Sequence, residues 1–315
     1  MTGMLLRRVA ASAVTALLAS IVVFLLVRAV PGNVVQQMLG QTSDPAAEQA
    51  LREFFGMDRP LYTQYLDWLT GALSGDLGTA WLSGAEVSGL VGNALVVTLE
   101  LTLLTLLVAT VIGVPLGLVA GIREGRPVDS LVQSFSVVGL STPIFWLALM
   151  LLVGVSALFG WSPPLSYRSP LENLGENLTM MVLPVISLAM LQAAAYAQFV
   201  RQSVVSAAGE QYVVTARAKG LPERQVLFKH ILRNIMVQLI TFQGLLVVQI
   251  VGGAVVIESI FGLPGLGRLL LTSITARDYP VVQGGLLVVV VMALLVNLTI
   301  DLLYRVIDPR LKVEA

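Results

Sequence analysis

Long apolar runs separated by short polar segments dominate the chain. A membrane helix needs about 20 consecutive apolar residues to cross the hydrocarbon core. Six stretches meet this requirement, at residues 9–27, 94–122, 130–161, 178–200, 234–257 and 281–300. The pattern therefore predicts an all-α integral membrane protein with six transmembrane helices.

The second and third stretches are longer than the bilayer is thick. They must tilt, kink or project from the membrane, and Pro115 and Pro143 are the expected kink points. The second stretch also carries a stripe of small residues that favours close helix packing, formed by Gly113, Gly117 and Gly121.

The first stretch has two interpretations, a cleaved signal peptide and an uncleaved anchor. Its apolar run is longer than the roughly 7 to 15 residues of a signal peptide. No clear cleavage site follows before Pro31 and Gly32. We therefore interpret it as a membrane anchor.

Composition agrees with a membrane protein and excludes several function classes. Hydrophobic residues make up 56% of the chain and charged residues only 12%, whereas soluble domains have about a quarter charged residues. With 19 basic and 19 acidic residues the net charge is zero, which argues against a nucleic-acid partner. The chain has no cysteine and a single histidine, His230, which argues against a metal site or a nucleophilic enzyme.

The distribution of basic residues predicts the orientation. With a cytoplasmic amino terminus, 13 of the 19 Lys and Arg residues lie inside, and the six outside are Arg28, Arg52, Arg59, Arg168, Arg268 and Arg277. The positive-inside rule then predicts that both termini are cytoplasmic. The expected organisation is a first span in residues 1–30, an extracytoplasmic segment in 31–92, a five-helix core in 93–304 and a cytoplasmic tail in 305–315.

The outer segment contains its own helix signals. Asp44 and Pro45 are typical of an N-cap and first helical position, and Gly56 of a helix end. Pro60 opens a second amphipathic pattern. This segment forms a cap on the membrane surface, a docking surface for an extracytoplasmic partner, or both.

The cytoplasmic loop 201–233 carries six of the 13 inner basic residues. Residues 210–219 read as a helix, and Gly220 is placed to end it in the left-handed conformation. Pro222 then restarts a helix. A bent helical loop of this kind fits a groove in another protein, and the alternative is a basic helix lying on the membrane surface.

Polar residues inside the spans are few. Glu100, Glu258 and Asp301 are the acidic ones, and each is either interfacial or faces a transport path. Gln192 and Gln249 could hydrogen-bond a peptide backbone or a neighbouring helix. Glu258 is the strongest path candidate because its span is rich in small and polar residues.

Eight motifs, in order and over nearly the whole chain, resemble the membrane permeases of dipeptide and oligopeptide ABC importers, in particular the first of their two permease subunits. They are FGMDRPLY at 55–62, GDLG at 75–78, STPIFW at 141–146, YVVTARAKGL at 212–221, HILRN at 230–234, ESIFGLPGLG at 258–267, DYP at 278–280 and DPR at 308–310. The general importer loop begins Glu-Ala-Ala, of which only Ala216 is kept here, a departure usual for the peptide branch.

The resemblance implies a type I ABC importer fold and assigns sites. The residues expected to couple to an ATPase are Glu210, Tyr212, Thr215, Ala216, Arg217, Ala218, Lys219, Gly220, Leu221, His230 and Arg233. The expected translocation path follows from the polar positions in the spans, not from the resemblance, and includes Gln192, Gln249, Glu258 and Glu100. The expected outer turn lies in the ESIFGLPGLG motif and includes Gly262, Pro264, Gly265 and Gly267.

The resemblance also implies partners. These are a second permease subunit, two ATPase subunits or domains that use ATP and Mg, an extracytoplasmic substrate-binding protein and the lipid of a bacterial inner membrane. The chain lacks a phosphate-binding Gly-x-x-x-x-Gly-Lys-[Ser/Thr] motif, so no catalytic residue and no cofactor are expected in it. Nickel and glutathione remain alternative substrates, and a stand-alone ion-coupled carrier is the alternative function.

Overall fold

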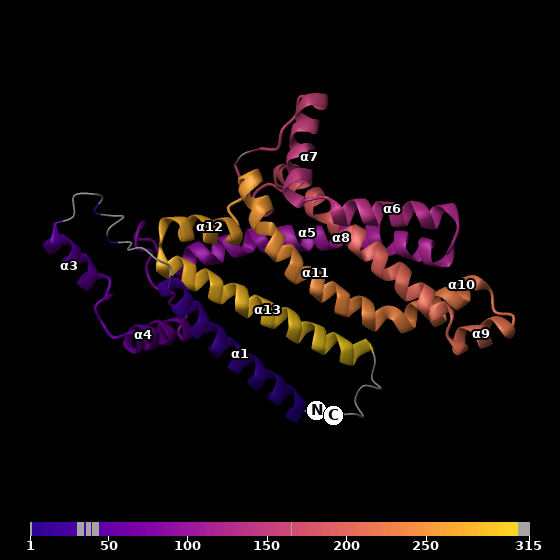
Figure 1. Cartoon of the computed structure of the whole chain (residues 1–315), viewed down its shortest axis with the longest axis horizontal. Coiled ribbons are helices and arrows are strands. Elements are labelled where there is room, and N and C mark those ends of the chain that lie inside the picture. Colours follow the sequence, from indigo (N-terminus) through magenta and orange to yellow (C-terminus); the bar gives the residue numbers. More distant parts are fainter. Residues whose placement is uncertain (1, 30–34, 36–38, 40–43, 165, 308–315) are drawn as a thin grey trace. The chain divides into compact units, whose positions relative to one another are not determined.

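The computed structural model describes residues 2–29, 35, 39, 44–164 and 166–307, and these are almost entirely helical (Figure 1). The described elements are α1 (Thr2–Ala29), α3 (Pro45–Phe54), α4 (Leu61–Leu73), α5 (Val87–Ile122), α6 (Pro127–Ser141), α7 (Ile144–Phe159), α8 (Leu174–Ala208), α9 (Gln211–Ala218), α10 (Glu223–Gln225), the π-helix η1 (Val226–Ile231), α11 (Leu232–Phe261), α12 (Leu266–Ala276) and α13 (Tyr279–Ile307).

Five of these helices are long and apolar enough to cross a membrane. They lie at Arg7–Ala29, Val87–Ile122, Leu174–Ala208, Glu223–Phe261 and Tyr279–Leu303. A sixth span exists if α6 and α7 are counted together. The all-α prediction is confirmed, and five of the six apolar stretches each lie in one continuous membrane-length helical segment.

The third stretch differs from its prediction. Pro143 does not kink one long helix but separates α6 from α7, whose axes are bent by 100°. A residue before proline is disfavoured in the helical region, and Thr142 is extended, with φ −84° and ψ 122°. Pro115, in contrast, lies within α5 without interrupting it.

The chain forms two compact units. Unit 1 combines residues 1–97 with 264–298, and unit 2 combines residues 98–263 with 299–315. Helix α5 begins at Val87, within the segment 31–92 that we expect outside the membrane. Most of the predicted tail, together with the DPR motif at 308–310, lies outside the described residues.

Unit 2 is organised around α8, the most buried of the candidate spans. Helices α6, α7, α9 and α11 all contact it. The predicted glycine stripe faces it as well: a Cβ on Gly113 would lie 2.7 Å from the Ala193 carbonyl oxygen, and one on Gly117 would lie 2.6 Å from that of Ala197. The stripe therefore packs α5 directly on the α8 backbone.

Unit 1 contains α1, α3, α4, α12 and most of α13. The predicted caps of α3 are present: the Asp44 carboxylate accepts a hydrogen bond from the Ala46 N–H, and Gly56 follows the helix with φ +64°. Helix α4 begins after Pro60, as expected, and packs on α1 through Tyr65, whose ring lies 5.2 Å from that of Phe24.

The connection between α4 and α5, in unit 1, contains a turn at residues 79–86. The ends of this turn are paired by an isolated antiparallel bridge between Thr79 and Glu86. The Asp278 carboxylate, at the junction of α12 and α13, accepts hydrogen bonds from the backbone N–H groups of Trp81 and Leu82 at 3.1 and 3.2 Å. This carboxylate therefore fixes the turn to the carboxyl-terminal helices of the same unit.

Candidate functional site

The loop at residues 201–233 consists of two short helices joined by a glycine turn. Helix α9 ends at Ala218, and Gly220 has φ +76°. The N–H of Gly220 donates to the Arg217 carbonyl at 2.9 Å, and that of Leu221 to the Ala216 carbonyl at 3.4 Å. This pair of bonds is the Schellman helix ending, and it confirms the predicted role of Gly220.

After the turn the chain does not form the simple second helix that was expected. Pro222 precedes a single turn, α10, and residues Val226–Ile231 then form a π-helix that leads into α11. Such wider turns are frequent at functional sites. Nothing in the apolar periodicity of the loop distinguishes them from an ordinary helix.

One side of the loop is part of the core of unit 2. Val213 and Ala216 of α9 are buried with Val226 and Ile231 of η1, in the same cluster as Val204 of α8. Tyr212, which precedes Val213 in α9, is 37% exposed. The inner side of the loop therefore packs against α8.

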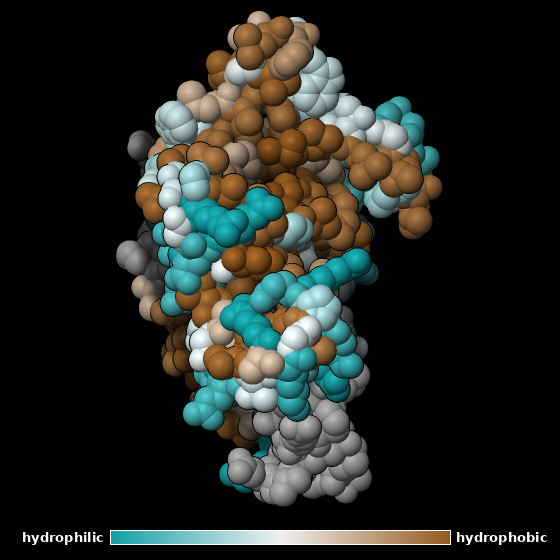
Figure 2. All heavy atoms as spheres, turned by 90° about the vertical axis from the view of Figure 1, so that its right-hand side faces the viewer, coloured by the Kyte–Doolittle hydropathy of each residue, from teal (hydrophilic) through white to brown (hydrophobic). Residues whose placement is uncertain are grey.

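The other side of the loop is open and combines charge with apolar surface. Phe228 is 55% exposed and lies in a shallow depression with Arg224 and Lys229. Figure 2, viewed from the side on which α9 and α10 lie in Figure 1, shows hydrophilic and hydrophobic atoms interspersed on this face. An exposed aromatic residue between two cations is suited to a protein partner.

An ion pair crosses between the two halves of the loop. Arg217 in α9 donates to the Glu223 carboxylate in α10 at 2.8 Å, and both side chains are exposed. A surface pair of this kind stabilises by at most about 1 kcal/mol. It orients the two short helices rather than holding the loop together.

A buried ion pair that was not predicted from the sequence lies at the base of the loop. Arg201 of α8 binds Asp129 of α6 through two hydrogen bonds, one of them 2.8 Å between Nη2 and Oδ2. The Asp129 side chain is 2% exposed and also accepts bonds from the Gly125 N–H and the Gln133 amide. An aspartate at the edge of an apolar span is the only sequence signal for it.

The structure places the predicted coupling residues in different environments. Most are exposed and available to a partner: Glu210, Tyr212, Thr215, Arg217, Ala218, Lys219, Gly220 and Arg233. Leu221 and His230 are half-buried, and Ala216 is 5% exposed. Ala216 therefore supports the fold of the loop from inside.

The polar residues predicted for a translocation path also differ from one another. Glu258 is fully buried and accepts a hydrogen bond from the Thr98 hydroxyl at 2.6 Å. Gln192 is 2% exposed, and its Oε1 accepts no hydrogen bond within the described part of the chain. Gln249 is exposed. The structure thus does not gather them into one cluster.

Glu100 accepts a hydrogen bond from the Tyr167 hydroxyl at 2.6 Å. Tyr167 lies in the connection between α7 and α8. Burial and the adjacent carboxylate raise the pKa of Tyr167 above its usual value, so it remains a proton donor to Glu100 at physiological pH.

The predicted outer turn is a helix-to-helix connection. Gly262 ends α11 with φ +70°, and Gly265 is the N-cap of α12. Gly267 is buried in the first turn of α12, and Pro264 is exposed. Across the described residues, His, Asp and Glu side chains form no group of three suited to a metal ion.

Comparisons with solved structures support this fold. The MetNI methionine ABC transporter in an inward-facing conformation aligns with 70% of this chain and 96% of its own, with a TM-score of 0.53 and 18% identity. The crystal structure of an amino acid ABC transporter with histidines aligns with 71% of this chain and 94% of its own, with a TM-score of 0.51 and 19% identity.

Sequence comparisons are more specific. A putative peptide transport system permease protein of Brucella abortus is 35% identical over 314 residues, covering 100% of both chains. The dipeptide transport system permease protein DppB of Escherichia coli K12 and the glutathione transport system permease protein GsiC of Escherichia coli O6:H1 are each 34% identical, covering 99% of both chains.

Two family descriptions match almost the entire chain. Residues 1–102 match the N-terminal part of a binding-protein-dependent transport system membrane component, and residues 113–313 match the binding-protein-dependent transport system inner membrane component. This family consists of transport permease subunits rather than enzymes. The chain therefore belongs to the binding-protein-dependent transport system inner membrane component family, as an ABC importer permease.

Proposed function

We propose that this chain forms half of the translocation pathway of an ATP-driven importer for di- and oligopeptides. It works with a second permease, two ATPase subunits or domains that bind ATP and Mg, and an extracytoplasmic binding protein, in a bacterial inner membrane. The observation that carries the proposal is the loop at residues 201–233, which presents an exposed mixed surface while its inner side is part of the core around α8.

The loop is suited to transmit motion. A partner that binds Phe228 and its neighbouring cations moves a segment whose Val213 and Val226 are packed with α8. Rigid-body displacement of packed helices is a common way in which one site controls another. ATP-driven closure of the ATPase pair would in this way change the access of the membrane pathway.

Peptide is the substrate class that we favour, because two of the full-length relatives described above are named for peptide or dipeptide transport. Glutathione is a second candidate, because GsiC matches equally well over the full chain. Competition between a labelled dipeptide and glutathione for uptake separates the two.

The coupling proposal is tested by a double variant of the loop surface, Arg224→Ala with Phe228→Ala, in the complete importer reconstituted into liposomes. We expect the ATPase subunits to copurify poorly and peptide-stimulated ATP hydrolysis to fall at least about tenfold, as for loss of interface hot spots. Arg126→Ala is the matched control, since Arg126 is exposed but lies outside the loop. Uptake by this chain alone, without ATP or partners, would instead show an ion-coupled carrier.

A further inference from the structure

A cavity of about 580 Å³ lies within unit 1, between the outer segment and the start of α13. Ligand pockets for small molecules typically measure about 300–1,000 Å³. Three of the eight family motifs contribute to its lining, through Gly56, Gly78 and Pro280 among others. The loop at residues 201–233, called the coupling loop below, does not line it, and neither do the residues predicted for the translocation path.

Two buried hydrogen-bond donors on the wall of this cavity have no acceptor within the described part of the chain. One is Nε2 of Gln283, whose side chain belongs to a residue only 3% exposed, and the other is Nε1 of Trp68. Leaving a buried donor unpaired costs about 1–3 kcal/mol. Such groups are available to an acceptor that the described residues do not supply.

Two guanidinium groups lie on the same wall. Arg28 donates through Nε and Nη2 to the side-chain Oε1 of Gln64, which leaves Nη1 with only a 3.5 Å contact to the Phe24 backbone carbonyl. Arg59 reaches Asp67 at 3.2 Å, but both side chains are about 60% exposed, so this pair is weak. Arg59 can therefore bind a further carboxylate, whereas the Arg28 guanidinium also lies 3.5 Å from the centroid of the Phe24 ring and is already engaged.

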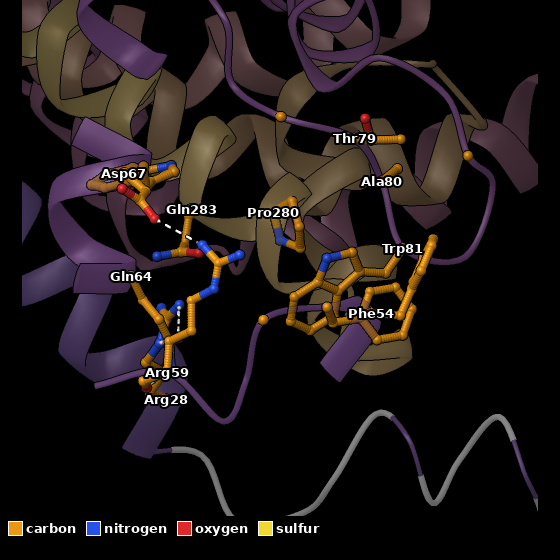
Figure 3. Close-up of a pocket in the computed structure, with 15 residues that line it drawn as sticks. Arg28, Phe54, Arg59, Gln64, Asp67, Thr79, Ala80, Trp81, Pro280 and Gln283 are labelled. Atoms are coloured by element: carbon orange, nitrogen blue, oxygen red, sulfur yellow. Dashed lines mark hydrogen bonds and ion pairs between the residues drawn. The ribbon is translucent and has the colours of Figure 1, made fainter. Parts of the chain in front are cut away.

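Aromatic residues form another part of the lining. Phe55 and Trp81 lie with ring centroids 4.6 Å apart, and Phe54 is 81% exposed. In Figure 3 the polar side chains of Asp67, Arg59 and Gln283 lie on one side and those of Trp81 and Phe54 on the other. A ligand that binds both the polar and the aromatic side of the cavity has an anionic hydrogen-bond acceptor next to a large apolar group.

We infer that this cavity binds the carboxyl-terminal end of a short peptide whose last residue is aromatic or large and apolar. The carboxylate accepts hydrogen bonds from Gln283, Trp68 and Arg59, while the terminal side chain packs against Trp81 and Phe54. An inorganic anion would leave the aromatic wall unused. The choice of a peptide rests on the proposed function, whereas the carboxylate and the apolar group follow from the cavity.

The test is calorimetric binding to the complete importer in lipid nanodiscs, without ATP and without the binding protein. The probes are Ala-Phe, its carboxyl-terminal amide and Ala-Gly. We expect Ala-Phe to bind, and the amide and Ala-Gly to bind at least about tenfold more weakly. The amide lacks the negatively charged carboxylate, and Ala-Gly lacks the aromatic side chain. Equal affinity for Ala-Phe and its amide would overturn the inference, as would no binding of Ala-Phe.

Variants then assign the binding to this cavity. Gln283→Leu and Trp68→Phe remove one donor each while keeping most of the volume, and Arg59→Gln removes an exposed cation; we expect each to weaken Ala-Phe binding about tenfold. Arg52→Gln is the control, because Arg52 is an exposed cation of α3 that does not line the cavity. Equal effects of Arg59→Gln and Arg52→Gln would refute the assignment.

Parallel uptake assays keep this inference separate from the proposed function. Binding that depends on Arg59 without any ATP-driven uptake would contradict peptide import but retain the site. Uptake of Ala-Phe with no binding at the cavity would contradict the site alone. Arg59-dependent binding of the substrate-binding protein without binding of Ala-Phe would assign the cavity to a protein partner and reject the peptide.

Discussion

The backbone conformation of one residue, Gly220, sets the turn between the two short helices of the coupling loop. Its φ of +76° is accessible to glycine but costs other L-residues roughly 1–2 kcal/mol. A Cβ at this position would meet no atom within 4 Å, so strain rather than collision is the obstacle. We expect Gly220→Val to lower peptide-stimulated ATP hydrolysis of the complete importer while the chain still inserts into the membrane.

Two further substitutions separate backbone strain from other effects of mutating this loop. Gly220→Asn should retain most activity, because asparagine tolerates the left-handed region. Gly209→Ala should also be mild, since Gly209 has φ −83° and an added Cβ would lie 3.6 Å from the Ser206 carbonyl oxygen, an ordinary van der Waals contact. If Gly220→Asn and Gly220→Val were equally inactive, the left-handed turn would not be the reason for the glycine.

Residues whose role depends on near neighbours were predictable from sequence, and those that depend on distant partners were not. The caps at Asp44 and Gly220 follow from local rules of helix ends. The pair between Asp129 and Arg201 joins positions 72 residues apart, and Asp278 binds a backbone N–H 197 residues away. No periodicity within one sequence encodes such pairings.

At the scale of elements, the packing of α5 on α8 depends on glycine. An added Cβ on Gly117 would come within 2.6 Å of a backbone oxygen, which cannot rotate away as a side chain can. We expect Gly117→Ala to destabilise the protein by about 1–3 kcal/mol, measured as a lower unfolding temperature in detergent. Gly92→Ala on the same helix has open space, so it should be neutral or slightly stabilising; equal losses in both variants would contradict direct packing.

The buried ion pair between α6 and α8 holds the base of the coupling loop. Asp129→Ala leaves the Arg201 guanidinium, whose side chain is 16% exposed, without its carboxylate. Removing one member of a buried pair costs about 3–5 kcal/mol. We therefore expect a large fall in unfolding temperature and loss of coupled ATP hydrolysis.

Replacing both Asp129 and Arg201 tests whether the loss of stability in Asp129→Ala comes from the unpaired charge of Arg201. Asp129→Ala combined with Arg201→Met removes the uncompensated charge, so stability should recover in part relative to Asp129→Ala alone. Strictly additive losses in the double variant would show that the two side chains do not act as a pair.

The break between α6 and α7 was predicted from the sequence in its position but not in its size. The sequence indicated a disturbance at Pro143, and the disturbance is there, but its size depends on more than the proline. Pro115 and Pro184 both lie inside continuous helices. At Pro143, unlike at Pro115 and Pro184, the preceding residue is extended, and this ends the helix. The 100° bend that results does not follow from composition.

At the scale of the whole molecule, the membrane spans could be predicted because the hydropathy and length of each span depend on one continuous segment. The division into two units depends instead on which distant segments pack together, and residues 1–97 associate with residues 264–298. The cavity of about 580 Å³ in unit 1 is formed by residues from both of these segments. Its lining therefore combines motifs that the sequence keeps far apart.

Orientation in the membrane is the remaining property of the whole chain, and the absence of cysteine makes it directly testable. The excess of basic residues predicts that the turn containing Ser83 is outside and the loop containing Gln211 is inside. Both residues are exposed, so each can be replaced by a labelling site. In intact spheroplasts a membrane-impermeant maleimide should label Ser83→Cys but not Gln211→Cys, and inverted vesicles should give the reverse. The opposite pattern would place the loop on the side without ATP and exclude its contact with cytoplasmic ATPases.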